Sequence, residues 1–157
     1  MTRSISGRVA ELGLTLEAAA APAANYVPFV QEGNLLYISG QISRKGGKAA
    51  YLGRLGEQIS DADGVEAAKL SALGLLSQIA AATGDKLDRV ARVVRLGVFV
   101  ASAPDFNRQS AIANGASDLM VEVFGDAGRH ARSAVGVAAL PQGVAVEIEA
   151  VVALTQA

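Results

Sequence analysis

Three charged residues interrupt the apolar stretch at the end of the chain, between residues 131 and 154. Arg132, Glu147 and Glu149 stand there among Val, Ala, Gly and Ile residues. A charged group that leaves water needs an ionic partner, a shell of hydrogen bonds or a chemical role. Because alternate residues of a strand share a face, Glu147 and Glu149 point to the same side, and Arg132 shares a face with Ala134.

Two interpretations of these charges stay open on spacing alone. If segments 131–138 and 144–154 pair as a hairpin, Arg132 lies level with the region 147–151, and a structural salt bridge to one glutamate explains both charges. Alternatively, the planar guanidinium of Arg132 binds the carboxylate of a ligand through two hydrogen bonds. A nearby glutamate would then handle a proton or a water molecule.

The first half of the chain predicts the elements that come before this stretch. Apolar residues at helical spacing predict a short helix over 4–12, followed by a low-complexity connector that reaches Pro22. Residues 25–42 indicate two strands joined at Glu32-Gly33-Asn34. The Gly-rich and basic segment 43–57 is typical of an exposed loop.

The second half predicts two long helices and three strands. A helix is expected over 61–84, a strand around the apolar run 93–100, and a second helix over 105–124, with strands at 131–138 and 144–154. This order predicts an α+β domain in which both helices cover one face of a single sheet. The strands are too apolar for water on the other face, so we expect a homo-oligomer that buries it.

Composition narrows the class of protein. The chain has 157 residues, a net charge of −1, no cysteine and only 3 Tyr and 4 Phe. These numbers predict one domain over 1–157, argue against disulfides and thiolate chemistry, and give little support for nucleic-acid binding. The first residues have no apolar signal core and no segment is a clear membrane span, so we expect a soluble, cytoplasmic protein without a membrane partner.

Several motifs resemble the reactive intermediate deaminase family (Rid or YjgF-like, also called endoribonuclease L-PSP). The segment R-S-A-V-G-V-x-x-L-P-x-G-V-x-V-E-I-E, from Arg132 to Glu149, is similar to the C-terminal signature of that family. Y-I-S-G-Q-I at 37–42 resembles its S-G-Q strand end, and P-F-V at 28–30 resembles its P-Y-V segment. The resemblance covers the chain from about residue 21, which leaves 1–20 as an N-terminal extension with a short helix.

The resemblance implies a chorismate-mutase-like α+β fold, with a single mixed sheet and two long helices on one face. It also implies a homotrimer with three clefts between subunits. In these clefts Arg132 would bind the carboxylate of a small metabolite and Glu147 would position or activate water, while Ser39 and Asn114 line the cleft. The implied reaction is hydrolysis of enamines or imines, such as 2-iminoacids, to ketoacids and ammonia, with no cofactor and no metal.

Two positions depart from the family pattern. The usual cysteine two residues after the arginine is Ala134, and the tyrosine of P-Y-V is Phe29, which donates no hydrogen bond. The substrate cleft predicted around Phe29, Ser39, Asn114 and Ala134 is therefore drier than in the family. A trimer that binds small carboxylate metabolites without turnover is the alternative function. The single histidine, His130, is expected in a loop or an interface.

Overall fold

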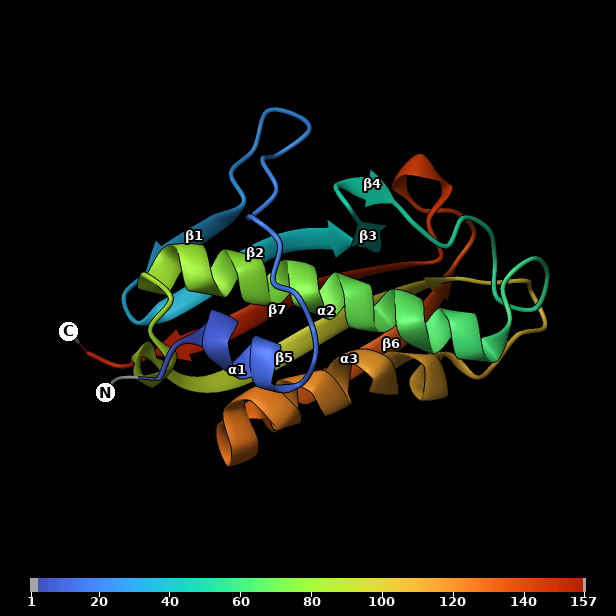
Figure 1. Ribbon diagram of the computed structural model, residues 1–157. Coiled ribbons are helices and arrows are strands. Elements are labelled where there is room, and N and C mark those ends of the chain that lie inside the picture. Colours follow the sequence, from blue (N-terminus) through green and yellow to red (C-terminus); the bar gives the residue numbers. More distant parts are fainter. Residues whose placement is uncertain (1–2, 157) are drawn as a thin grey trace.

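The computed structural model describes residues 3–156 (Figure 1). The ends of the predicted domain, residues 1, 2 and 157, lie outside this range. A short helix α1 (Ile5–Glu11) precedes two long helices, α2 (Asp61–Thr83) and α3 (Gln109–Phe124). Five strands form the main sheet: β1 (Phe29–Glu32), β2 (Leu35–Ile42), β5 (Val90–Ala101), β6 (Ala131–Val137) and β7 (Val146–Leu154). The chain also forms a small hairpin, β3 (Arg44–Lys45) with β4 (Lys48–Ala49), and three single-turn helices at Leu87–Arg89, Gly125–Gly128 and Pro141–Gly143.

Helix α2 is the central helix of the layer that covers the sheet. Its first turn is capped by the hydroxyl of Ser60, which accepts a hydrogen bond from the Asp63 amide at 3.2 Å, and Gly84 ends it in the left-handed conformation. By length and hydropathy α2 would pass as a membrane span, but half of that window is buried inside the fold. Its apolar side therefore belongs to the core, as in other buried helices.

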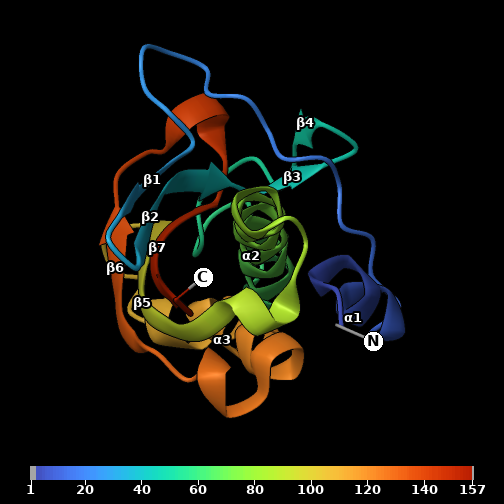
Figure 2. The same cartoon turned by 90° about the vertical axis from the view of Figure 1, so that its left-hand side faces the viewer.

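The sheet is mixed and its strand order is β1-β2-β7-β5-β6. Neighbouring strands are antiparallel except for β5 and β6, which run parallel because α3 forms the crossover between them. Figure 2 shows α2 and α3 on one side of the sheet, with nothing over the other side. The α+β prediction, with a single main sheet and helices on one face, is confirmed.

The last two strands do not pair as the hairpin that one interpretation of the charges required. Strand β5 lies between β6 and β7, so Arg132 pairs with Leu96 of β5, and Leu96 in turn pairs with Ala150 of β7. The connection through Pro141–Gly143 crosses over β5 instead of making a tight turn. Sequence spacing could not exclude the hairpin, because both arrangements join two apolar strands by a short connection.

Two other boundaries differ from the expectation. Helix α3 begins at Gln109 rather than at 105, after a connection that follows Pro104. Segment 43–57 is not only an exposed loop, since it contains the β3–β4 hairpin and places Leu55 fully in the core. Its apolar residues are too widely spaced to show a periodic pattern.

The two faces of the sheet differ in what covers them. Alternate side chains of β2, β5 and β7 are buried against the helices, among them Leu36, Ile38, Leu96, Val98, Ile148 and Val152. The side chains that alternate with them point to the uncovered face. On this face, to which β1 and β6 also contribute, Val30, Tyr37 and Val135 each expose about half of their surface. This apolar, uncovered face is what a partner subunit would bury.

Candidate functional site

The guanidinium of Arg132 lies against one side of α3. Because Arg132 pairs with the buried Leu96, its side chain points to the helix side of the sheet. One terminal nitrogen donates to Asn114 Oδ1 at 2.9 Å and to Ser117 Oγ at 3.0 Å. The other donates to the Oγ and the carbonyl of Ser110, at 2.8 and 3.2 Å. Residues 110, 114 and 117 recur at helical spacing, so one face of α3 holds the guanidinium.

All of these acceptors are neutral. No carboxylate within residues 3–156 lies within 4.0 Å of Arg132, so the salt bridge to Glu147 or Glu149 does not form in the chain. Each terminal N–H group of Arg132 has an acceptor, but the positive charge has no counter-ion in the described part of the chain. A guanidinium held by neutral oxygens at a half-buried position is suited to an anionic ligand.

A second network extends from Ser117 to His130. The Nδ1–H of His130 donates to the carbonyl of Gly128 at 2.6 Å, which leaves Nε2 to accept from the Ser117 hydroxyl at 2.9 Å. The same hydroxyl oxygen accepts from Arg132. His130 therefore orients Ser117 and, through it, the guanidinium.

The S-G-Q motif forms a β-bulge that contacts the side chain of Glu147. Strand β2 advances three residues, from Ile38 to Gln41, while β7 advances two, from Ala150 to Ile148. The bulge brings the backbone of Gly40 against the side chain of Glu147. A methyl group at Gly40 would overlap Oε1 of Glu147 and lie only 2.9 Å from its Cδ. Glycine is therefore required at this position for the glutamate to pack as it does.

Glu147 and Glu149 lie side by side on the uncovered face. Burial of the Glu147 side chain raises the pKa of its carboxyl, and the nearby charge of Glu149 raises it further. Glu149 itself crosses over Gly97 of β5 and lies 3.9 Å from Arg95, in an exposed ion pair. Glu147 is thus a half-buried carboxyl with a raised pKa, as general bases often are.

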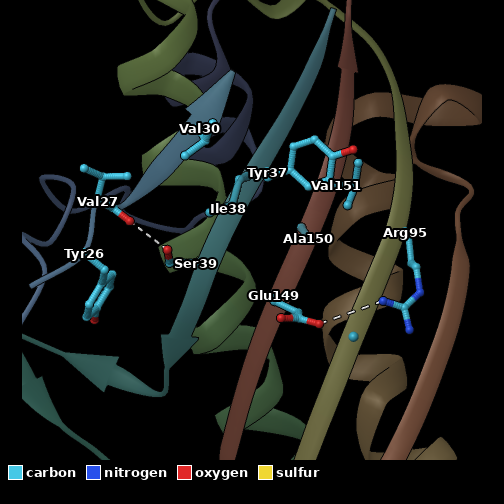
Figure 3. Close-up of a pocket in the computed structure, with 11 residues that line it drawn as sticks. Tyr26, Val27, Val30, Tyr37, Ile38, Ser39, Arg95, Glu149, Ala150 and Val151 are labelled. Carbon is cyan, nitrogen blue, oxygen red and sulfur yellow. Dashed lines mark hydrogen bonds and ion pairs between the residues drawn. The ribbon is translucent and has the colours of Figure 1, made fainter. Parts of the chain in front are cut away.

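Two cavities lie beside these glutamates. The larger one, of about 500 Å³, is lined by Ser39, Tyr37, Arg95 and Glu149 on the uncovered face (Figure 3). Ser39 lies at its wall, where the hydroxyl donates to the Val27 carbonyl at 2.7 Å. The smaller cavity, of about 100 Å³, is lined by Glu147, Gly40, Gln142, Arg44 and residues 20–23.

The predicted site residues thus fall into two groups on opposite faces. Arg132 and Asn114 meet on the helix side, where Ala134 also packs against the core. Glu147 and Ser39 lie on or beside the uncovered face. Phe29 pairs with Ile38 and packs against the core, so it lines neither of the two cavities described above.

Sequence reasoning missed Ser110, Ser117 and Gly40. The two serines were detectable only as polar positions at helical spacing around Asn114, and nothing marked that face of the helix as the one toward Arg132. Gly40 belongs to the S-G-Q motif, but the sequence does not show why glycine is needed there. The reason is the close approach of the Glu147 side chain, which depends on the register of the bulge.

Comparisons with known proteins show which family and which solved structures this chain resembles. The family model of endoribonuclease L-PSP matches residues 16–154. Protein TCP17 of Trypanosoma cruzi is 53% identical over 154 residues, which cover 95% of this chain and 96% of that protein. The crystal structure of Atu1372 from Agrobacterium tumefaciens, a protein of unknown function, superposes with a TM-score of 0.90 at 47% identity, over 96% of this chain and 92% of that one. The E. coli protein TdcF, crystallised with bound serine, has a TM-score of 0.62 and 27% identity, over 88% and 94% of the two chains.

Proposed function

Because the chain belongs to the endoribonuclease L-PSP family, we propose that it hydrolyses small enamine or imine intermediates to ketoacids and ammonia. We place the reaction in clefts between the subunits of a homotrimer, with 2-iminoacids as the substrate class. Arg132 binds the substrate carboxylate and Glu147 acts on the attacking water. Serine bound to TdcF supports a small ligand of the amino-acid type.

The observation that carries this proposal is the position of the two groups on opposite faces of one sheet. Arg132 faces α3 from β6, which is an edge strand, and Glu147 faces the uncovered side from β7, with β5 between them. A single chain cannot bring them to one ligand. When the edge strand of one subunit meets the uncovered face of the next, Arg132 of one and Glu147 of the other share a cleft.

The chemistry needs only a base and a carboxylate clamp. The carbon of a protonated C=N group is electrophilic, and water attacks it while the Glu147 carboxylate takes one proton from the water. The resulting carbinolamine has an O–H and a C–N bond on the same carbon. Glu147 returns the proton to nitrogen, and the C–N bond breaks as the Glu147 carboxylate takes the proton of the O–H group. The ketoacid leaves with ammonia, which takes up that proton as ammonium. The neighbouring charges of Arg132 and the ligand carboxylate hold the reacting carbon in place.

Binding requires that Arg132 exchange some of its hydrogen bonds. Its four terminal N–H bonds already point to Ser110, Asn114 and Ser117. The Ser110 hydroxyl can rotate, so the ligand carboxylate replaces it at one terminal nitrogen and the hydroxyl becomes a donor to the ligand. Ser117, whose proton is donated to His130, and Asn114 keep holding the other terminal nitrogen, and the exchange adds the missing counter-ion.

A binding protein without turnover is the second candidate. Phe29 and Ala134 pack against the core and provide no polar group where the family has a tyrosine and a cysteine. Arg132 would still bind a small acid. In that case ketoacids stabilise the protein against heat in an Arg132-dependent way, with no hydrolysis.

Mixed trimers test both the chemistry and the two-subunit cleft. Ketoacid release from an enzymatically generated 2-iminoacid is measured for wild type, Arg132→Ala, Glu147→Gln and a co-refolded mixture of the two variants. Each variant alone should lose the acceleration, by about 10²- to 10⁴-fold for the base. In an equal mixture about a quarter of the clefts combine an intact Arg132 with an intact Glu147, so activity returns to about that fraction. No recovery in mixtures shown to contain mixed trimers would refute the shared cleft, and no acceleration by wild type would favour the binding protein.

A further inference from the structure

A third cavity lies on the helix side of the fold, away from Arg132. It has a volume of about 370 Å³ and three walls: the connector 13–20 (the strap), one side of α2, and the end of β2 with the β3–β4 hairpin. Figure 2 shows the strap passing beside this hairpin, outside α2. Gly13, Leu14 and Thr15 of its wall precede residue 16, where the match to the family begins. This cavity is therefore built partly by a segment outside the matched region.

The strap is fixed over the cavity by specific bonds. The Glu17 carboxylate accepts from the amides of Gly46 at 2.7 Å and Gly47 at 3.3 Å, in the hairpin turn where both glycines have positive φ. On α2, Ser77 donates to the Glu17 carbonyl at 2.8 Å and Gln78 donates to the Ala20 carbonyl at 2.9 Å. The cavity is thus part of the fold and not a gap under a loose segment.

Charge and shape in the cavity favour an anion with an apolar body. Three cations line it, Arg44, Lys45 and Lys69, and in the described part of the chain none of them has a carboxylate within 4.0 Å. The amide groups of the hairpin turn already hold Glu17, and Glu66 is the other carboxylate at the rim. Apolar side chains complete the lining: Leu14, Ile42, Leu70 and Leu73. Arg44 and Lys69 are half-buried and Lys45 is exposed, and cations without a carboxylate partner among residues 3–156 beside an apolar wall are suited to an amphiphilic anion.

We propose that this cavity binds a small monocarboxylate with a short apolar chain, at a site separate from the Arg132 cleft. Lys69 and Arg44 bind the carboxylate, and the leucines of α2 contact the chain. Gln41, Ile42 and Arg44 line both this cavity and the one beside Glu147, so a bound ligand would contact the same segment that borders the proposed catalytic carboxylate.

Amide chemical shifts of the full-length protein, titrated with hexanoate, acetate and 1-hexanol, test the proposal. Hexanoate should give saturable shifts at Gly47, Gly74 and Ser77, with acetate and hexanol at least about tenfold weaker because each lacks one half of the interaction. Equal responses to all three compounds, or no saturable shift at these amides, would overturn the proposal.

Three variants locate the site. Lys69→Met should weaken hexanoate binding about tenfold, because a charge-assisted hydrogen bond is lost. Lys48→Met, in the same hairpin but outside the cavity lining, should leave it unchanged. Arg132→Ala should also leave it unchanged, and loss of binding in that variant would assign the ligand to the Arg132 cleft. Retained affinity in Lys69→Met, with the fold intact by circular dichroism, would contradict the proposed contact.

Discussion

The most direct test of the proposed catalytic role of Glu147 is Gly40→Ala, which adds a methyl group against its carboxylate. In Gly40→Ala the new Cβ lies 2.9 Å from Cδ of Glu147 and overlaps Oε1, whereas ordinary contact begins at 3.4 Å. Because the obstacle is the far end of a flexible side chain, the fold can remain and the carboxylate moves instead. Its oxygen must retreat by on the order of 1 Å, a displacement that lowers catalytic rates by up to about 100-fold.

The matched control is Gly97→Ala. Its new Cβ lies 2.9 Å from Cγ and Oε1 of Glu149, so the same substitution displaces the other glutamate of the pair. Glu149 has no assigned role in the reaction, and its ion pair with Arg95 is exposed. We expect Gly97→Ala to retain most of the activity, while both variants lose similar small amounts of stability.

Two measurements compare Gly40→Ala with Gly97→Ala. Ketoacid release from a 2-iminoacid should fall about 100-fold in Gly40→Ala, with the loss mainly in kcat because Arg132 still binds the substrate. An NMR titration of the Glu147 carboxyl should show its pKa falling toward the ordinary value as the side chain moves into solvent. Equal activity of the two alanine variants, with the larger shift in the pKa of Glu147 found in Gly40→Ala, would refute the catalytic role of Glu147.

Three further predictions concern stability, binding and assembly. Folding raises the pKa of Glu147, so its charge opposes folding once the pH exceeds the ordinary pKa; Glu147→Gln should therefore have a higher Tm than wild type at neutral pH, and calorimetry should show this gain vanish on acidification. Asn114→Ala removes one acceptor of Arg132 and should raise KM about two- to tenfold with little change in kcat. Tyr37→Arg places a charge on the uncovered face and should give inactive 16.0 kDa monomers by light scattering.

The sequence predicted the elements of the fold better than their pairing. Hydrophobic periodicity located both long helices and every strand of the main sheet, because burial of one face imposes a regular spacing. The place of β6 was missed, since the choice between a hairpin with β7 and a parallel pairing with β5 depends on the crossover through α3. That choice is made by packing across the whole sheet, which no local pattern records.

For the candidate site too, the sequence predicted the residues better than their arrangement in space. The resemblance indicated Arg132, Glu147 and Asn114, and the structure brings two of these together at 2.9 Å. Alternation along the strand correctly put Glu147 and Glu149 on one face, but the face of Arg132 relative to them required the strand order. The hydrogen bonds of Ser110 and Ser117 to the guanidinium depend on how α3 crosses the sheet, which is a tertiary property.

In the proposed cleft the charge of Arg132 would affect the pKa of Glu147, and a bound ligand would change that effect. Among residues 3–156 of the single chain, Arg132 lacks a counter-ion, and the pKa of Glu147 is raised by burial and by Glu149. A guanidinium brought near by assembly would offset part of this rise in the pKa of Glu147, because an opposite charge favours the ionised form. When the carboxylate of a ligand pairs with Arg132, that positive charge is neutralised and the pKa of Glu147 rises again. The carboxylate is therefore most basic when the substrate is bound, which is when the attacking water must lose a proton.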